Sequence, residues 1–202
     1  MFPTISFFIA GLIIFAAVYF SITTDIIRNP SDVNSATAHK RYSFSRTQLM
    51  WWTVIISCCF IIMFGETGGF ELNSTTLILL GIGAATTTGG SVIDASQAQA
   101  AKATGTVRHQ DSKSTHFLHD ILSDGHGVST HRFQALVFNI LFGFIFVAFF
   151  FKHGYQFTEF NQYELGTLGI SSGSYLAMKT NENKSPANQA QQEKPPSNNQ
   201  SS

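Results

Sequence analysis

Charged residues are scarce in this chain, and they are missing altogether from its longest apolar stretches. Lys, Arg, Asp and Glu make up 12% of the 202 residues, and the formal net charge is zero. A balanced charge gives no long-range attraction for nucleic acid, so we expect no nucleic-acid partner. Pumps and coupled transporters generally need an ionisable side chain within a span, so its absence argues against both classes.

The signatures of catalysis are also missing. The sequence has no glycine-rich phosphate loop, no nucleophile elbow, no HExxH motif and no paired-carboxylate cluster in a plausible pocket. Its two cysteines, Cys58 and Cys59, are adjacent within an apolar run, where small packing residues are more plausible than a disulfide. We therefore expect no enzyme activity, no catalytic residues, no cofactor and no metal.

Long apolar runs are what the chain has in abundance. The uncharged run 5–22 approaches the roughly 20 residues needed to cross a bilayer, and runs 49–64 and 133–151 are two more. Segments 75–93 and 165–178 are richer in small residues, and the second is short for a crossing, about 21 Å as a helix. The sequence predicts an all-α, polytopic membrane helical bundle of about five spans.

The two halves of the chain resemble each other, which is why segment 165–178 is counted as a span. The similarity predicts a parallel two-helix internal repeat with an N-terminal helix (1–28), two hairpins (42–94 and 128–178), a loop with a short amphipathic helix (95–127) and a disordered tail (179–202). The matching residues are Ser43, Arg46, Gln48, Phe60 and Phe64 with Ser129, Arg132, Gln134, Phe146 and Phe150, and Leu77, Leu80, Gly81 and Ile82 with Leu165, Leu168, Gly169 and Ile170.

The distribution of positive charge predicts the orientation. Eleven of the twelve Lys and Arg residues fall on the segments 28–46, 102–132 and 179–202, and only Lys152 falls on the other side. Because cytoplasmic loops carry the excess of Lys and Arg, we expect the N-terminus outside and the C-terminus in the cytoplasm.

Small residues mark the candidate helix-packing positions. They allow close contact between the two halves or between protomers, or within one monomer without any oligomer. Their hydroxyl groups could also line a passive pore, although packing is the simpler interpretation. The candidates are Gly81, Ala85, Thr87, Gly169, Ser172 and Gly173.

A second set of candidates is expected at the membrane interface. Arg46 and Arg132 occupy equivalent places near helix N-termini, where they could reach lipid phosphates or a carboxylate, with Asp94 and Asp124 as candidate partners. Gln48 and Gln134 are expected to hydrogen-bond to neighbouring helices. Trp51 and Trp52 are expected near headgroup depth.

Five histidines lie in the central loop region. His116 and His119 have a spacing that could ligate zinc, but the remaining spacings match no closed zinc template. Solvated or membrane-surface histidines are the simpler interpretation. The three others are His109, His126 and His131.

Several stretches resemble a family of bacterial inner-membrane proteins of unassigned activity. They are Arg46 to Trp52, Leu80 to Gly83, Asp120 to Asp124, Val128 to Gln134 and Leu168 to Gly173. The resemblance implies a bacterial inner-membrane location and five spans, and it transfers no catalytic residue. The leading hypothesis is a scaffold or anchor, with the lipid bilayer and either further copies of the chain or other membrane proteins as partners. The alternative is an oligomeric passive channel for ions or small solutes.

Overall fold

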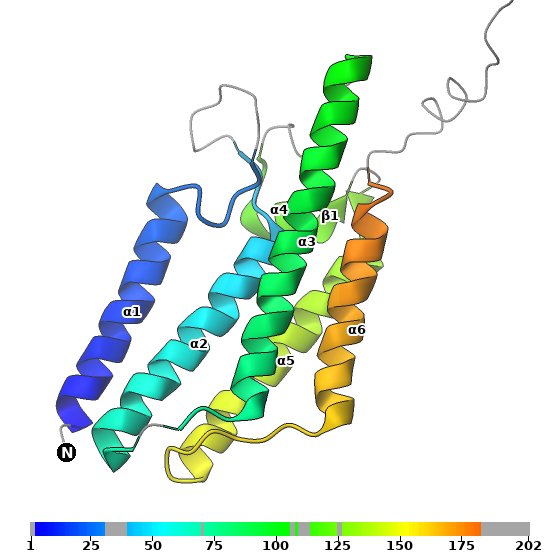
Figure 1. The fold of residues 1–202 in the computed structure, drawn as a ribbon. Coiled ribbons are helices and arrows are strands. Elements are labelled where there is room, and N and C mark those ends of the chain that lie inside the picture. Colours follow the sequence, from blue (N-terminus) through cyan, green and yellow to red (C-terminus); the bar gives the residue numbers. More distant parts are fainter. Residues whose placement is uncertain are drawn as a thin grey trace, which may run out of the picture.

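A computed structural model describes residues 3–30, 40–69, 71–105, 108, 114–124 and 127–182. Within these ranges the chain is mostly helical, as predicted (Figure 1). Two short strands of two residues each, β1 (Ser123–Asp124) and β2 (Gly127–Val128), pair in antiparallel orientation. The helices are α1 (Pro3–Thr23), α2 (Phe44–Thr67), α3 (Ser74–Thr104), α4 (Phe117–Leu122), α5 (Thr130–Lys152) and α6 (Gln162–Lys179).

Four of these helices, α1, α2, α3 and α5, are long and apolar enough to cross a membrane. Helix α6 is less apolar than these four, because its 18 residues include Glu164, Lys179 and several hydroxyl side chains. The described part of the chain therefore has the features of a membrane protein, with four candidate spans and one further long helix, α6, that is less apolar.

Asparagine and serine residues set the starts of the long helices. Asn73 caps α3 by accepting a hydrogen bond from Thr76 N at 3.0 Å, and Asn161 caps α6 by accepting one from Glu164 N at 3.1 Å. Ser43 is the N-cap residue of α2, although its hydroxyl makes no capping bond. At its other end α3 continues to Thr104 and stops at Gly105, whose φ of 66° is in the left-handed region that glycine favours.

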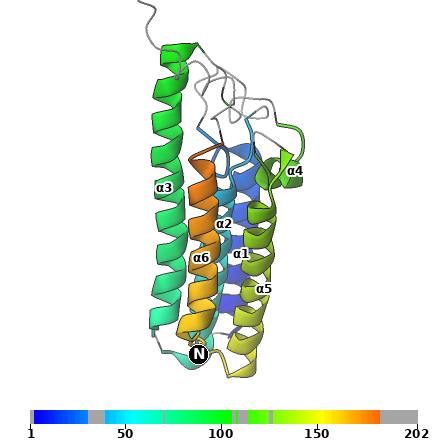
Figure 2. The ribbon, with the colours of Figure 1, turned by 90° about the vertical axis from the view of Figure 1, so that its right-hand side faces the viewer.

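Four helices form a closed ring in which each contacts the next, in the order α2, α3, α6, α5, and α1 packs on the outside of α2. Helices α2 and α5 run in one direction and α3 and α6 in the other (Figure 1). Helix α3 extends well beyond its neighbours at the end where α4 lies (Figure 2).

Large aromatic and aliphatic side chains fill the ring. Phe146 and Phe150 on α5 are fully buried, and Phe157 and Phe160 from the α5–α6 connection pack against Phe146 at centroid distances of 6.0 and 5.9 Å. The connection is fixed to α3, because Asn73 Nδ2 donates to Thr158 O at 3.0 Å. This end of the bundle is therefore held by an aromatic core and the contacts between its two loops.

The predicted boundary of the C-terminal tail is wrong. We expected residues 179–202 to be disordered, but α6 includes Lys179 and a turn carries the chain on to Glu182. Both side chains are buried, with 4% and 6% of their surface exposed. Residues 183–202 lie outside the described part of the chain.

Candidate functional site

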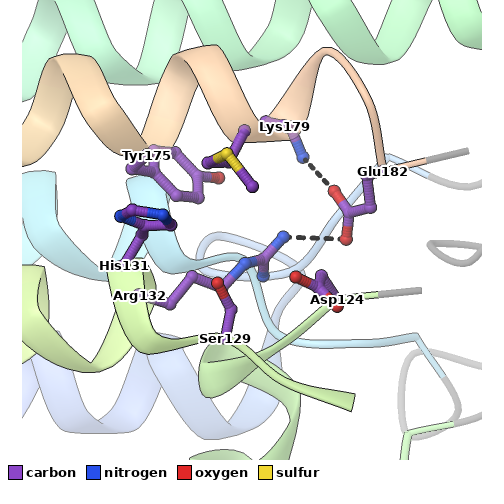
Figure 3. A pocket seen from close by; sticks show the side chains of 8 residues that line it. Asp124, Ser129, His131, Arg132, Tyr175, Lys179 and Glu182 are labelled. Carbon is purple, nitrogen blue, oxygen red and sulfur yellow. Dashed lines mark hydrogen bonds and ion pairs between the residues drawn. The ribbon is translucent and has the colours of Figure 1, made fainter. Parts of the chain in front are cut away.

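A group of buried charges lies at the end of the bundle opposite the aromatic core. It consists of Asp94, Arg132, Lys179 and Glu182, hereafter the charged cluster. Arg132 Nη2 lies 2.7 Å from Glu182 Oε1, and Lys179 Nζ lies 3.0 Å from Asp94 Oδ1 and 3.7 Å from Glu182 Oε2. Figure 3 shows Glu182 between the two cations. The cluster thus ties α3, α5 and α6 together through two carboxylates and two cations.

The local structure explains how these charges meet. Arg132 lies in the first turn of α5 and Lys179 is the last residue of α6, so the two cations lie at the same end of the bundle. The turn after α6, closed by Glu182 N donating to Lys179 O at 3.3 Å, carries the carboxylate back over both. On α3, Gly90 leaves room for α2, since a Cβ there would lie 3.3 Å from Ser45 Oγ.

A second buried ion pair attaches the loops beside the charged cluster. Arg41, in the α1–α2 connection, lies 3.4 Å from Asp120 on α4 and donates to Ser123 Oγ at 2.6 Å. Burial lowers the pKa of the Arg41 guanidinium, and the charge of Asp120 opposes that effect. Arginine nevertheless stays charged at physiological pH. The α1–α2 connection and α4 are therefore fixed to each other by a charged contact.

The space beside the charged cluster is too small for a substrate. The cavity lined by Asp124, Arg132 and Glu182 has a volume of about 10 Å³, which is room for one water molecule. Removing one partner of a buried ion pair typically costs about 3–5 kcal/mol, because the other charge is left unpaired in a low dielectric. The arrangement is suited to holding helix ends together.

The carboxylate hypothesis was right for one of the two repeat arginines, but with a different partner. Arg132 pairs with Glu182 and not with Asp124, and Asp94 pairs with Lys179 and not with Arg46. Arg46 is half-buried, and no carboxylate of the described residues forms an ion pair with it. Lipid-phosphate contact remains the prediction for Arg46.

This difference between the two arginines leads to a matched test. Arg132→Lys should lower the apparent melting temperature in detergent, because lysine cannot reproduce the guanidinium contact with Glu182 or its position over the Tyr175 ring. Arg46→Lys should leave the melting temperature within error, because lysine also reaches a lipid phosphate. Equal effects of the two substitutions would contradict the assignment of Arg132 to the buried cluster.

The two glutamines of the repeat also have different surroundings. Gln48 is buried and its Nε2 donates to Ser172 Oγ at 3.0 Å, which joins α2 to α6 as expected of a helix-bridging side chain. Gln134 is exposed on α5. The prediction of interhelical bonding is therefore confirmed for Gln48 alone.

The tryptophans make hydrogen bonds within the bundle, and their place near headgroup depth stays a prediction. Trp52 is only 1% exposed, and its Nε1 donates to Asn139 Oδ1 at 2.8 Å inside the ring. Trp51 is half-buried and donates to Asn139 O at 3.1 Å. Asn139, which sequence reasoning missed, thus organises the α2–α5 contact; the signal for it was an amide in the interior of the apolar run 133–151.

Replacing Asn139 tests this contact. Asn139→Leu should destabilise the protein by about 1–3 kcal/mol, because the buried Trp52 indole N–H is left without an acceptor. The double variant Trp52→Phe with Asn139→Leu should cost less than the sum of the two single variants, since no unpaired donor then remains. Additive losses, measured by unfolding in detergent, would show that the two side chains are not coupled.

Most of the predicted small packing residues face outward. Gly81, Ala85 and Gly173 are exposed, and a Cβ at Gly81, Gly169 or Gly173 would meet no atom within 4 Å. Packing within one monomer is therefore wrong for these glycines. Thr87 and Ser172 do make helix contacts: Thr87 Oγ1 donates to Ser45 O at 3.0 Å, and Ser172 accepts from Gln48. The helix glycines at which a Cβ would crowd a side chain of a neighbouring helix are Gly83, Gly89, Gly90 and Gly143.

The described residues contain no group of three or more His, Cys, Asp or Glu side chains that could hold a metal ion. His116, His119 and His131 are exposed. His109 and His126 lie outside the described part of the chain.

Comparison with known proteins adds no assignment. No protein-family model, no curated protein and no solved structure matches this chain.

Proposed function

We propose that this chain is a non-enzymatic integral protein of the bacterial inner membrane that acts as a scaffold or anchor for protein partners. It crosses the membrane five times, with the N-terminus outside and the charged cluster and C-terminus on the cytoplasmic side. The excess of Lys and Arg at the end of the bundle that carries the cluster supports this orientation.

The observation that carries the proposal is the projecting end of α3 and the way its base is fixed. Asp94 pairs with Lys179, Gln97 Nε2 donates to Lys179 O at 2.9 Å, and Arg108 Nη1 donates to Asp94 O at 2.9 Å. Beyond this base the last turns of α3 consist mainly of Ala, with Gln99 and Lys102, and are mostly exposed. They project beyond the neighbouring helices (Figure 2). A helical surface that is held at its base and carries a single charge is suited to contact with another protein.

The shared direction of the helices supports the fifth span and the internal repeat. Helices α3 and α6 run in parallel, and both begin at a capping asparagine, Asn73 or Asn161, on the aromatic end of the bundle. Helix α6 has 18 residues, which corresponds to about 27 Å. Its buried face meets α3 and α5, so its hydroxyl groups are partly shielded from lipid.

The channel alternative receives less support. The hydroxyl groups of Thr87 and Ser172 are hydrogen-bonded inside the chain, so a single copy offers no hydroxyl-lined path at these positions. A pore would require other residues and several copies.

Crosslinking in native membranes distinguishes the two functions. A photoreactive residue at Gln99 or Ala103, on the projecting end of α3, should give adducts with another protein. The same residue at Phe15, which is 68% exposed on the apolar α1, should not. Purified protein in planar bilayers should carry no current. An ion current abolished by Thr87→Leu or Ser172→Leu would contradict the scaffold and favour the channel.

A further inference from the structure

Arg46 differs from the other arginines of the chain in its surroundings. The other four are buried, and each donates to an oxygen atom of the chain; they are Arg28, Arg41, Arg108 and Arg132. Arg46 is half-buried, and no hydrogen bond or ion pair joins its guanidinium to any of the described residues. Its charge is therefore available to an anion from outside the chain.

The matching arginine of the second half shows what this position binds. Arg46 and Arg132 are each the third residue of their helices, which begin after the N-cap residues Ser43 and Ser129. Beside Arg132 the guanidinium meets an oxyanion, the Glu182 carboxylate, at 2.7 Å. The described part of the chain supplies no carboxylate to Arg46, so an oxyanion there has to come from elsewhere.

Arg46 lines a hollow on the surface of α2, between the end of α1 and α3, hereafter the Arg46 hollow. Its volume is about 310 Å³, at the lower end of the range for small-molecule sites. Four of its residues recur at helical spacing on one face of α2, and Ile26 and Thr87 complete it from the two sides. The four are Arg46, Leu49, Met50 and Thr53.

The two hydroxyl groups of the hollow are already used inside the chain. Thr53 donates to Leu49 O at 2.8 Å, and Thr87 donates to Ser45 O at 3.0 Å. The guanidinium of Arg46 is therefore the group of the hollow that can bind an anion.

The arrangement along α2 is that of an amphiphile site. Arg46 lies in the first turn of α2, and Thr53 lies seven residues further into the apolar helix, about 10 Å away along its axis. Leu49 and Met50 place hydrocarbon beside the guanidinium, and Ile26 is 45% exposed at the rim. Helices α1, α2 and α3 are all apolar enough to span a membrane, so in a bilayer the hollow adjoins lipid.

A phospholipid matches both parts of the Arg46 hollow. A guanidinium binds phosphate oxygens through parallel N–H donors, and the apolar residues below it suit the start of an acyl chain. The lining contains one cation and no carboxylate, so it offers no ion-pair partner to an ammonium headgroup. We infer that the hollow binds an anionic phospholipid of the cytoplasmic leaflet, with the lipid phosphate on Arg46 and an acyl chain beside Leu49 and Met50.

This inference rests on the membrane embedding in the proposed function but not on the existence of a protein partner. The full chain, purified in detergent, is titrated with phosphatidylglycerol or phosphatidylethanolamine, and bound lipid is counted by native mass spectrometry. One phosphatidylglycerol should bind several-fold more tightly than one phosphatidylethanolamine. Inorganic phosphate at millimolar concentration should not displace the lipid, because it has no hydrocarbon to place in the hollow.

Two charge variants form a matched pair. Arg46→Gln and Lys152→Gln each remove one positive charge, but Lys152 is exposed at the opposite end of the bundle. Arg46→Gln should weaken phosphatidylglycerol binding about tenfold, because a charge-assisted hydrogen bond is lost. Lys152→Gln should leave the affinity unchanged, and Arg46→Lys should lose less than Arg46→Gln because its charge is kept.

A second pair changes the shape of the hollow without changing its charge, and it tests the inference even if Arg46→Gln does not fold. Thr53 and Ala148 are both exposed on candidate spanning helices, but only Thr53 lines the Arg46 hollow. Thr53→Phe should weaken phosphatidylglycerol binding several-fold, and Ala148→Phe should not.

Equal binding of the two lipids, equal effects of the two glutamine variants, or displacement by inorganic phosphate would overturn the lipid site. A photoreactive residue at Met50 that forms adducts with another protein in native membranes, and none with lipid, would also overturn it. A lack of protein adducts at Gln99 and Ala103 would count against the scaffold, but it would leave the lipid affinities unchanged.

Discussion

Deleting residues 182–202 should destabilise the folded protein by about 3–5 kcal/mol, the cost typical of an unpaired buried charge. The reason is that Glu182 is the carboxylate shared by Arg132 and Lys179, at 2.7 and 3.7 Å, and all three side chains are buried. The loss would be measured as a lower unfolding free energy in mixed micelles and a lower apparent melting temperature.

Deletion from residue 184 onward is the matched control, because it removes most of the same segment and keeps Glu182. This shorter deletion should leave stability within error, and Glu182→Gln in the full chain should reproduce most of the loss. Equal stability of the two deletions would show that Glu182 does not hold the helix ends.

Gly143→Leu should prevent stable packing of α2 against α5. A Cβ at this position would lie 2.7 Å from both Cζ2 and Nε1 of Trp51, which is closer than atoms in a packed core can approach. Trp51 cannot move away without losing its hydrogen bond to Asn139 O. Even Gly143→Ala should cost about 1–3 kcal/mol, the usual range for overpacking.

Gly81→Leu and Gly169→Leu are the controls for this prediction. Both positions are open in the chain, so each variant should unfold at the same denaturant concentration as the parent when the protein is monomeric in detergent. A loss at Gly81 that appears only at high protein concentration would instead locate a contact between copies. Tolerance of Gly143→Leu would contradict the described α2–α5 packing.

The sequence was sufficient to predict most of the helices, because apolar runs, capping residues and terminal glycines are local signals. The apolar runs 49–64 and 133–151, for example, lie within α2 and α5. A short helix was also expected within the loop 95–127, and α4 lies there.

The charged cluster could be predicted only in part, because ion pairing depends on which chain segments return to the same place. The sequence left a lipid phosphate and a carboxylate open as partners of Arg132, and the candidate carboxylate was Asp124. The actual partner, Glu182, lies fifty residues away in a segment whose composition resembles a disordered tail. The glycines were misjudged for a related reason: a small residue allows a close approach, and only the helix orientation decides whether a neighbour is there. Gly143 has such a neighbour and Gly81 does not.

The two halves of the chain are similar in sequence, but matching residues lie in different surroundings. Phe150 is fully buried, whereas its counterpart Phe64 is 53% exposed, and Arg132 is buried where Arg46 is half-exposed. Helix α1 packs on the outside of α2. Within the described part of the chain, no long helix packs on the outside of α5 in the same way. The extra helix and the C-terminal turn give equivalent residues different environments.

Cysteine labelling at the two ends of α6 tests the five-span account most directly. Tyr163 and Thr180 are exposed near opposite ends of this helix, and Cys58 and Cys59 would first be replaced by alanine. We predict that Tyr163→Cys reacts with a membrane-impermeant thiol reagent in intact cells, whereas Thr180→Cys and Ala103→Cys react only after permeabilisation. Reaction of Thr180→Cys in intact cells would contradict the fifth span and the cytoplasmic position of the charged cluster.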